Sequence, residues 1–311
     1  MPSKLIKGTY HVKNRAPDGD SIAFQANNTA NWDFFNWSRG FRKPTPEKNR
    51  PIQLRIEGID SLETHYEGFA QPLAIAKSAT DALLRAFGIP VLTYNLNFTK
   101  IVTAGDGARG AIIAGDTPGD APPIPHAPAG GDAVEGAIIA ADVDGYDRPI
   151  AYALLGDHGL ADGAELSALT DAMVELTINY KLAAEGLAYP TFYTTTNETG
   201  LAAISRAAAA AIEDRRGIWA FDRSFGFQFW GPRTILEEAV ILPKLFRRLV
   251  NFCEESDDMA NLAVWLAGKR DPFTVISTGQ RFQKLSDLVF VNGREVGLKF
   301  DPLDVMFRPK S

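Results

Sequence analysis

The sequence contains a single cysteine, Cys253, among its 311 residues. One cysteine excludes an intramolecular disulfide and fits a reducing compartment, although a secreted protein without disulfides would have the same composition. The chain lacks an apolar run of the roughly 20 residues that a membrane span needs. Its N-terminus also lacks the apolar segment and small-residue cleavage site of a signal peptide. We therefore expect an unprocessed, cytoplasmic protein with no membrane segment.

Motifs of several common enzyme classes are missing as well. The four histidines are scattered and form no Cys/His cluster with zinc-ligand spacing, and there is no glycine-rich motif that cradles phosphates. Nor is there an excess of positive charge, because the formal net charge is −6. This charge argues against broad electrostatic adhesion to nucleic acid, so any polyanion must be held by a local basic patch or through a metal ion.

The sequence does contain an order of strands and helices that is typical of a small closed barrel with packed helices. Turn residues between apolar runs predict two hairpins early in the chain, and Asn292-Gly293 predicts a third near its end. Apolar residues at helical spacing predict three helices before residue 217. The ranges are 4–13 with 21–26 and 137–143 with 149–155 for the first two hairpins, and 72–87, 167–185 and 202–216 for the helices.

A basic and aromatic segment, residues 27–50, interrupts this pattern. Arginines that meet phosphates, interleaved with rings that stack on bases, are how many proteins bind single-stranded nucleic acid. The alternative is that the rings pack the segment onto the domain, and the sequence leaves both interpretations open. The residues that we expect to contact substrate under the first interpretation are Trp37, Arg39, Arg42 and Lys43.

The stretch from residue 51 to residue 66 carries most of the candidate chemistry, with Arg55, Asp60 and Glu63 on one strand and the turn that ends it. Arg55 and Asp60 would face opposite sides of an ideal strand, so they can converge only if the strand bends near Gly58. Taken alone, the stretch is typical of an amphipathic strand that runs into a polar turn. Its interpretation changes with two further motifs, Asp18-Gly19-Asp20-Ser21 and Tyr146-Asp147-Arg148.

In this order the motifs resemble the staphylococcal nuclease (thermonuclease) family. That family has Asp-Gly-Asp-Thr, an arginine followed five residues later by Asp-Thr-Pro-Glu, then Tyr-Gly-Arg, a helix ending in Gly-Leu-Ala and a helix ending in Ile-Trp. The last two landmarks occur here as Gly186-Leu187-Ala188 and Ile218-Trp219. The resemblance covers roughly residues 5–223 once the insertions at about 27–50 and 97–132 are removed, and its five dispersed landmarks occur in order.

The resemblance implies an α+β fold in which residues 1–223 form an OB-fold, a five-stranded β-barrel with packed helices. Residues 224–311 would then be a C-terminal α+β accessory module. The implied activity is hydrolysis of phosphodiester bonds in DNA or RNA with low sequence specificity and 3′-phosphate products, and the segment 27–50 favours single strands. One Ca²⁺ would be held by the carboxylates of Asp20 and Asp60 and the backbone carbonyl of Ser61, hard oxygen ligands of the kind that calcium requires.

The same resemblance assigns the catalytic groups. Glu63 matches the family's general base, which activates or orients the attacking water. Arg55 and Arg148 match two arginines that clamp the phosphate, a task suited to a guanidinium because it stays charged and donates two parallel hydrogen bonds. Tyr146 matches a tyrosine that contacts a terminal phosphate.

Two departures from the family pattern lie beside these groups. Leu62 replaces a proline, so the turn before Glu63 loses a fixed φ. Asp147 replaces a glycine beside Arg148, where its carboxylate could repel substrate, recruit a second cation or cap the turn.

The alternative to an active nuclease is a catalytically silent OB-fold module that binds nucleic acid or protein. The joint presence of Arg55, Glu63 and Arg148 favours the enzyme, because a pure binder has no need of Glu63. The C-terminal module carries no motif that identifies it. It could gate access to the site, join a second copy of the chain or dock a regulatory partner.

Overall fold

The computed structural model of the chain describes residues 2–12, 18–87, 92–94, 101–104, 133–256 and 258–309. Its largest sheet closes into a five-stranded barrel, because the first strand pairs with the second on one side and with a later strand on the other. In order around the barrel, the strands are β1 (Ser3–His11), β2 (Ser21–Ala26), β3 (Ile52–Ile56), β8 (Pro149–Leu155) and β7 (Ala133–Val143), with the short β9 (Glu165–Leu166) beside β1.

Both early hairpins predicted from the sequence are present, since β1 pairs with β2 and β7 with β8 in antiparallel register. β3 shows the alternation of a strand with one buried face: Ile52, Leu54 and Ile56 are buried and the residues between them are only partly buried. β3 also runs parallel to β8, with Arg55 opposite Ile150. The predicted α+β architecture with a closed five-stranded barrel is therefore confirmed.

Four helices pack beside the barrel: α1 (Leu73–Ala86), α2 (Asp171–Glu175), α3 (Ile178–Ala184) and α4 (Glu198–Glu213). The single helix predicted over 167–185 is wrong, because the chain breaks between α2 and α3. Thr177 is extended at this break, and its Oγ1 accepts a hydrogen bond from the backbone N–H of Tyr180, which starts a second helix. Periodicity alone did not reveal this internal cap.

The remaining elements are short. Before residue 224 they are η1 (Thr29–Phe34), β4 (Ile59–Asp60), β5 (Leu92–Tyr94), β6 (Ile101–Ala104), β10 (Tyr189–Pro190), β11 (Phe192–Tyr193) and η2 (Gly217–Ala220). After it they are β12 (Phe227–Gln228), η3 (Thr234–Glu238), α5 (Pro243–Glu255), η4 (Met259–Asn261), α6 (Leu262–Gly268), β13 (Arg270–Val275), β14 (Arg281–Lys284), α7 (Leu285–Leu288), β15 (Val289–Asn292), β16 (Glu295–Leu298), η5 (Pro302–Asp304) and β17 (Val305–Phe307). The predicted third hairpin is confirmed as β15 and β16. Of the insertion expected at about 97–132, only Ile101–Ala104 lies within the described residues.

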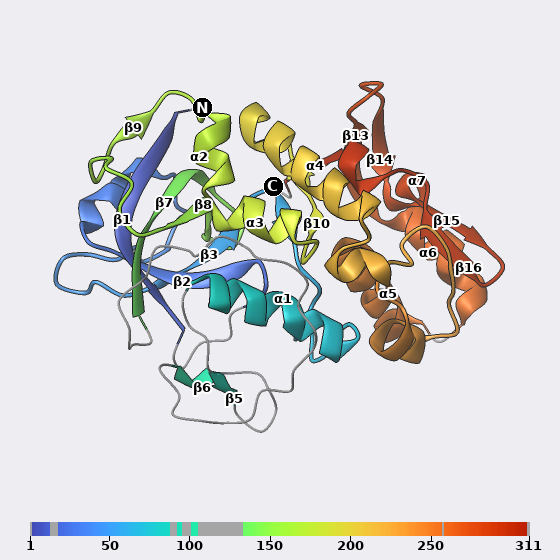
Figure 1. Cartoon of the computed structure of the whole chain (residues 1–311). Coiled ribbons are helices and arrows are strands. Elements are labelled where there is room, and N and C mark those ends of the chain that lie inside the picture. The colour runs from blue at the N-terminus through green and yellow to red at the C-terminus, as the bar shows by residue number, and fades with distance from the viewer. Residues whose placement is uncertain are drawn as a thin grey trace.

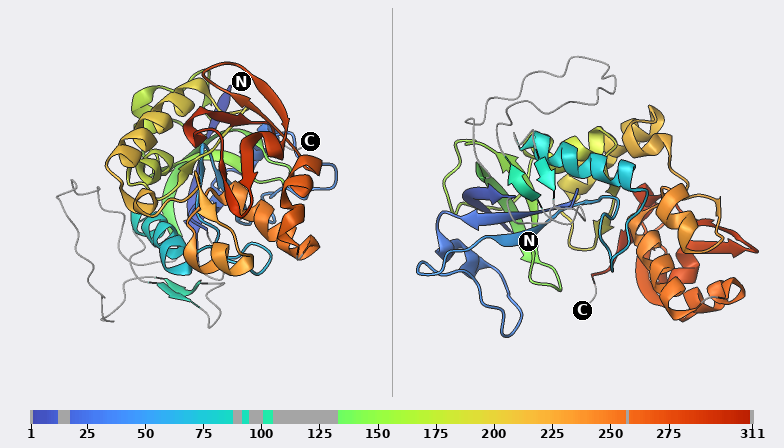
Figure 2. Two further views of the ribbon diagram at one scale, coloured as in Figure 1. Left: turned by 90° about the vertical axis from the view of Figure 1, so that its right-hand side faces the viewer. Right: turned by 90° about the horizontal axis from the view of Figure 1, so that it is seen from below.

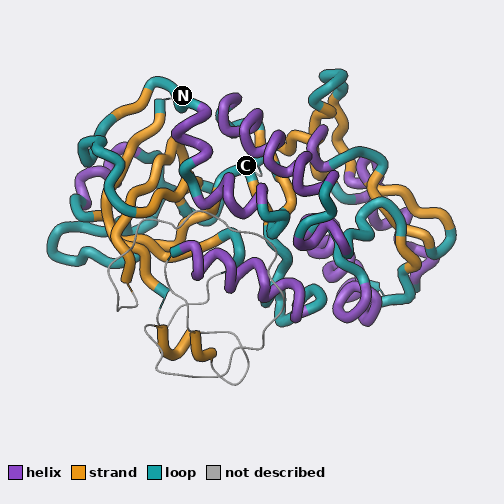
Figure 3. The backbone as a smooth tube through the Cα atoms, in the orientation of Figure 1, coloured by secondary structure: helices purple, strands orange, loops and turns teal. Residues whose placement is uncertain are grey.

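The barrel lies at one end of the molecule and the elements from α5 onward at the other, as Figures 1 and 2 both show. The helices α1, α3 and α4 lie between these two ends (Figure 3). One large hydrophobic cluster fills the barrel. A second hydrophobic cluster joins the C-terminal elements to earlier parts of the chain, because it includes Leu62 and Tyr189 as well as Phe246 and Leu249.

The C-terminal elements and the residues before 224 are also joined by hydrogen bonds. β17 pairs in parallel with β11, so the end of the chain adds to a strand that precedes α4.

The division of the chain at residue 223 stays a prediction. Among the described residues, no helix is both long enough and apolar enough to cross a membrane.

Candidate active site

A turn at Gly58 brings Arg55 and Asp60 together, as the sequence requires. Gly58 has φ +78°, and a Cβ on it would lie 2.6 Å from the side chain of Ile204, so a larger residue would be strained there. The turn separates β3 from β4, which pair with different strands. Arg55 Nη2 then lies 3.3 Å from Asp60 Oδ1, and the predicted bend is confirmed.

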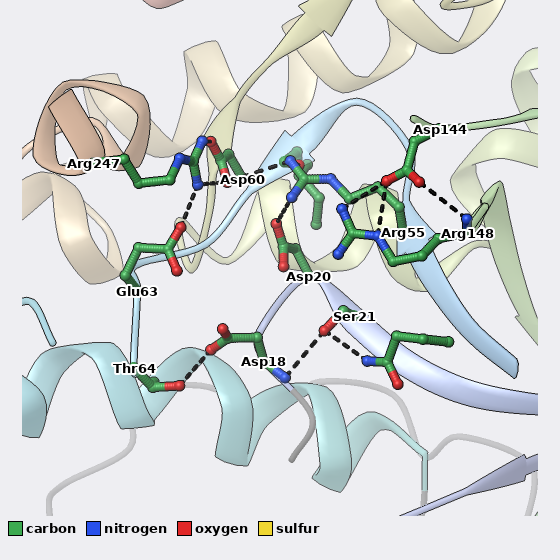
Figure 4. A network of polar contacts seen from close by, with 12 residues as sticks. Asp18, Asp20, Ser21, Arg55, Asp60, Glu63, Thr64, Asp144, Arg148 and Arg247 are labelled. Atoms are coloured by element: carbon green, nitrogen blue, oxygen red, sulfur yellow. Dashed lines mark hydrogen bonds and ion pairs between the residues drawn. The ribbon is translucent and has the colours of Figure 1, made fainter. Parts of the chain in front are cut away.

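Asp20 reaches the same arginine from the neighbouring strand. The backbone pairs Ser21 with Arg55, so the residue before Ser21 lies at the end of β2 nearest the Gly58 turn. Asp20 Oδ2 is 2.6 Å from Arg55 Nη1. The guanidinium of Arg55 therefore bridges the two carboxylates that the sequence predicts as metal ligands (Figure 4).

A second guanidinium, that of Arg247, enters the site from α5. Its Nη2 is 2.7 Å from Asp60 Oδ2, its Nη1 is 3.2 Å from Asp60 Oδ1, and Nη1 also contacts Glu63 Oε1. Figure 4 shows Arg247 approaching Asp60 and Glu63 from the side opposite Arg148. Sequence reasoning missed this residue, because nothing in an amphipathic helix 187 residues after Asp60 indicates that it reaches the site.

Glu63 is held in place through its backbone by Gln71. The Glu63 N–H donates to Gln71 Oε1 at 3.1 Å, and the Gln71 N–H donates to the Glu63 carbonyl at 2.9 Å. Gln71 is fully buried, and its Nε2 donates to the carbonyl of Ile241, just before α5, at 2.7 Å. The loop that carries the predicted base is thereby tied to the C-terminal part of the chain.

Leu62, where the family has proline, has a packing role. Its side chain is 0 % exposed and belongs to the second hydrophobic cluster together with Phe246 and Leu249 of α5. The turn before Glu63 is therefore anchored by apolar burial in a cluster that α5 shares, where the family pattern has the fixed φ of a proline.

Arg148 lies in the hairpin turn before β8. Since Ile150 is opposite Arg55, and residues two apart on a strand share a face, Arg148 lies on the same side of the barrel wall as Arg55. Asp144 holds it there: Asp144 Oδ2 is 2.6 Å from Nη2 and 2.8 Å from Nε of Arg148. Tyr146, in the same turn, is 82 % exposed, and the Arg148 guanidinium lies 5.6 Å from its ring centroid.

Asp147 takes the left-handed conformation that its glycine counterpart in the family pattern would favour, with φ +58°. Its Oδ1 accepts a hydrogen bond from the backbone N–H of Ser38 at 2.7 Å. The backbone N–H groups of the turn are capped by Asp144, whose Oδ1 accepts from Tyr146 and Arg148, so the capping role left open for Asp147 belongs to Asp144. Asp147 instead joins the Arg148 turn to the segment 27–50.

The aromatic rings of that segment pack mainly on one another and on the barrel. Trp32 and Phe35 are buried, Trp32 contacts Phe24 of β2, and Trp37 stacks on Phe41 with ring centroids 4.7 Å apart. The basic side chains stay outside: Arg39 and Arg42 are exposed, and Lys43 pairs with Asp33. The packing interpretation thus describes the buried rings, while the exposed Arg39 follows Ser38, the residue that contacts the Arg148 turn.

Burial and the charges of neighbouring residues give the carboxylates of the site different pKa values. Burial, and secondly the charge of Asp20, raise the pKa of Asp18 from 3.8 to about 6. Burial also raises the pKa of Asp20 to about 6, against the opposing charge of Arg55. Burial acts to raise the pKa of Asp60 too, but Arg247 and Arg55, followed by hydrogen bonds from Arg247 and Asp20, lower it to about 2. Burial raises the pKa of Glu63.

Asp18 is a further residue that the list of candidates missed, although it belongs to the Asp18-Gly19-Asp20 motif. Its Oδ1 accepts a 2.6 Å hydrogen bond from Thr64 Oγ1, next to Glu63. The site thus gathers the four carboxylates of Asp18, Asp20, Asp60 and Glu63 around the two guanidiniums of Arg55 and Arg247, which leaves an excess of negative charge.

The donor set fits one hard divalent cation with few protein ligands. Asp20 and Asp60 both contact the guanidinium of Arg55, at 2.6 Å and 3.3 Å, so the two carboxylates converge on one point, as a pair that flanks one ion would. Beside them, Ser61 is buried and its Oγ has no hydrogen-bond partner among the described residues. Within those same residues, no group of three or more His, Cys, Asp or Glu side chains is arranged to hold a metal ion. The predicted set of two carboxylates and a backbone carbonyl does not require such a group.

A scan of the chain against models of known protein families finds no match, and a search of curated proteins finds none either.

Proposed function

We propose that the chain is a Ca²⁺-dependent phosphodiesterase that hydrolyses nucleic acid, built on an OB-fold barrel. The observation that carries the proposal is the convergence of Asp20, Arg55, Asp60 and Glu63 at one end of a closed five-stranded barrel, with Arg148 in the turn just before β8, the strand that pairs with β3 at Arg55. These residues come from separate strands and turns, and they are the ones that the resemblance to the staphylococcal nuclease family assigns.

Two other landmarks of that resemblance support the proposal. The Ile218 N–H donates a 2.8 Å hydrogen bond to the carbonyl of Gly186, so the Gly-Leu-Ala and Ile-Trp motifs meet in space. Gly186 ends α3 with φ +68°, and Trp219 packs edge-on against Tyr189. Dispersed motifs that contact one another are expected of one conserved scaffold and not of chance matches in unrelated loops.

Each residue has a defined task in the proposed reaction. Asp20, Asp60 and the Ser61 carbonyl would hold the calcium ion, which when bound supplies positive charge to a phosphate oxygen. Glu63, whose pKa burial raises, would accept a proton from the attacking water. Arg55 and Arg148 would donate to the phosphate oxygens as negative charge gathers on them.

The substrate class follows from what lies around Arg148. Tyr146 is exposed beside it, and the Ser38–Asp147 hydrogen bond brings the backbone next to the exposed Arg39 of segment 27–50 to the same turn. A phosphate-binding arginine with a further cation and an exposed ring beside it suits an extended polyanion with bases, namely single-stranded DNA or RNA.

The second candidate function is a catalytically silent module that binds nucleic acid or protein. One observation favours it: Arg247 already pairs with both Asp60 and Glu63, the predicted ligand and the predicted base.

Cleavage of end-labelled single- and double-stranded DNA and RNA, with Ca²⁺, Mg²⁺ or chelator, separates the two candidates. We expect cutting with calcium, none with chelator, and 3′-phosphate ends. Arg148→Gln should lower the rate about 100-fold or more, as loss of a transition-state donor does. The variant is a specific probe, because the ion pair of Arg148 among the described residues is only with Asp144 of its own turn. Arg206→Gln, which breaks an exposed pair with Asp171, is the control and should not change the rate. Binding without cleavage under every condition would favour the silent module.

A further inference from the structure

Arg247 makes contacts in the site that a divalent cation would otherwise make. Its two terminal nitrogens approach both oxygens of Asp60, and one of them also contacts Glu63. Asp60 is 0 % exposed, so its charge has to be balanced by neighbouring groups and not by water. In the described structure that balance comes from Arg55 and Arg247.

The position of Arg247 is fixed by the docking of α5 on the loop that carries Glu63. One helical turn after Arg247, Asn251 Oδ1 accepts a 2.9 Å hydrogen bond from the Tyr66 hydroxyl. On the other side, the Ile241 carbonyl accepts from Gln71, and Leu62 is buried in the same cluster as Phe246. Polar contacts before and after Arg247, together with apolar packing between them, hold the guanidinium against Asp60.

The neighbouring cations of α5 behave differently. Lys244 and Arg248 both pair with Asp271 of β13, 3.0 Å and 2.8 Å away, and so balance a charge within the C-terminal elements. The carboxylate partners of Arg247 among the described residues are Asp60 and Glu63. This helix thus presents one arginine to the candidate site and its other two cations to its own module.

We propose that Arg247 is an intramolecular competitor of the divalent cation. This inference rests on the proposed function, because it assigns a regulatory role at the same site. Arg247 contacts both oxygens of Asp60 and also Glu63, whereas Arg55 approaches Asp60 through one oxygen, at 3.3 Å. A calcium ion at Asp60 would therefore meet its strongest repulsion from the like charge of Arg247. Calcium must therefore displace Arg247 from Asp60, and any event that moves α5 away from the Glu63 loop raises the affinity of the site for calcium.

The test compares calcium binding to the full-length wild type, Arg247→Gln and Arg248→Gln by isothermal titration calorimetry at neutral pH. We expect Arg247→Gln to lower the Kd for calcium at least about tenfold, because it removes a positive charge in contact with the ligand carboxylate. Arg248→Gln is matched to it, since it removes a half-buried arginine and its carboxylate pair from the same helix. Its Kd should equal that of the wild type.

Removal of Arg247 leaves two buried carboxylates with less compensation, so the Gln variant is first checked for folding by circular dichroism. If it does not fold, Arg247→Lys replaces it. Lysine keeps the charge but cannot approach both oxygens as a planar fork does, so the calcium Kd of Arg247→Lys should be lower than that of the wild type.

An unchanged or weaker calcium affinity in the Arg247 variant would overturn the inference. Cleavage assays on the same proteins show whether the proposed function fails with it. If calcium affinity is unchanged but cleavage falls, Arg247 acts on the substrate and the proposed nuclease stands. If no variant binds calcium or cleaves, both proposals fail. If Arg247→Gln binds calcium tightly and does not cleave, the competition stands and the nuclease activity is overturned.

Discussion

Leu62→Ala should both destabilise the protein and impair the candidate site. Leu62 is 0 % exposed and lies in the second hydrophobic cluster, between the predicted ligand Asp60 and the predicted base Glu63 in the chain. Truncation of a buried leucine to alanine costs about 2–5 kcal/mol through lost burial and the cavity that remains. We expect a loss in that range in the free energy of unfolding, measured by guanidinium denaturation with chelator present.

The control is Leu288→Ala, because Leu288 is 3 % exposed in the same cluster but lies in α7, far along the chain from the Glu63 loop. It should cost a similar free energy. Only Leu62→Ala should also slow calcium-dependent cleavage, since only Leu62 anchors the turn that positions Glu63. A stability loss below about 1 kcal/mol for Leu62→Ala, or equal cleavage rates in both variants, would refute the anchoring role.

Two further predictions concern the same region. Because the pKa of Asp18 is raised from 3.8 to about 6, its protonation stabilises the folded state fully below about pH 4, and that contribution is lost as the pH rises through 6. At about 1.4 kcal/mol per pKa unit, Asp18→Asn should raise the unfolding free energy at pH 7 by up to about 3 kcal/mol and have little effect at pH 4. Denaturant titrations of the metal-free protein at pH 7 and pH 4 measure this. No gain in unfolding free energy at pH 7, or an equal gain at both pH values, would contradict the prediction. Gly186→Ala should lower stability by about 1–3 kcal/mol or more, because φ is +68° and a Cβ would lie 2.4 Å from the Arg216 carbonyl oxygen; an unchanged melting temperature would show that the turn relaxes.

The parts of the fold that could be predicted from the sequence are those specified by local signals. Apolar runs on either side of turn residues indicated the β1–β2 and β7–β8 hairpins, and Asn292-Gly293 indicated the third. The bend at Gly58 followed from the chemical need to bring Arg55 to Asp60 across five residues. The break at Thr177 did not follow, because a threonine inside an amphipathic pattern signals a cap only once the chain around it is known to be extended.

The candidate site was predictable only where its residues lie in short motifs. Asp20, Arg55, Asp60, Glu63 and Arg148 stand in recognisable local patterns. Arg247 does not, because its role depends on the docking of α5 onto a loop far away in the sequence, and burial of Leu62 and Gln71 determines that docking. Contacts of this kind arise from tertiary packing, which periodicity and motif spacing do not specify.

The most direct test of the central claim is the rate of calcium-dependent cleavage of labelled single-stranded DNA by the wild type and by Glu63→Gln. Glutamine keeps the shape of the side chain but cannot accept the proton of the attacking water. A general base contributes about 100-fold to 10,000-fold, so we predict a loss of at least about 100-fold in rate while calorimetry shows that calcium still binds. Cleavage by Glu63→Gln at close to the wild-type rate would contradict the assignment of Glu63 as the base.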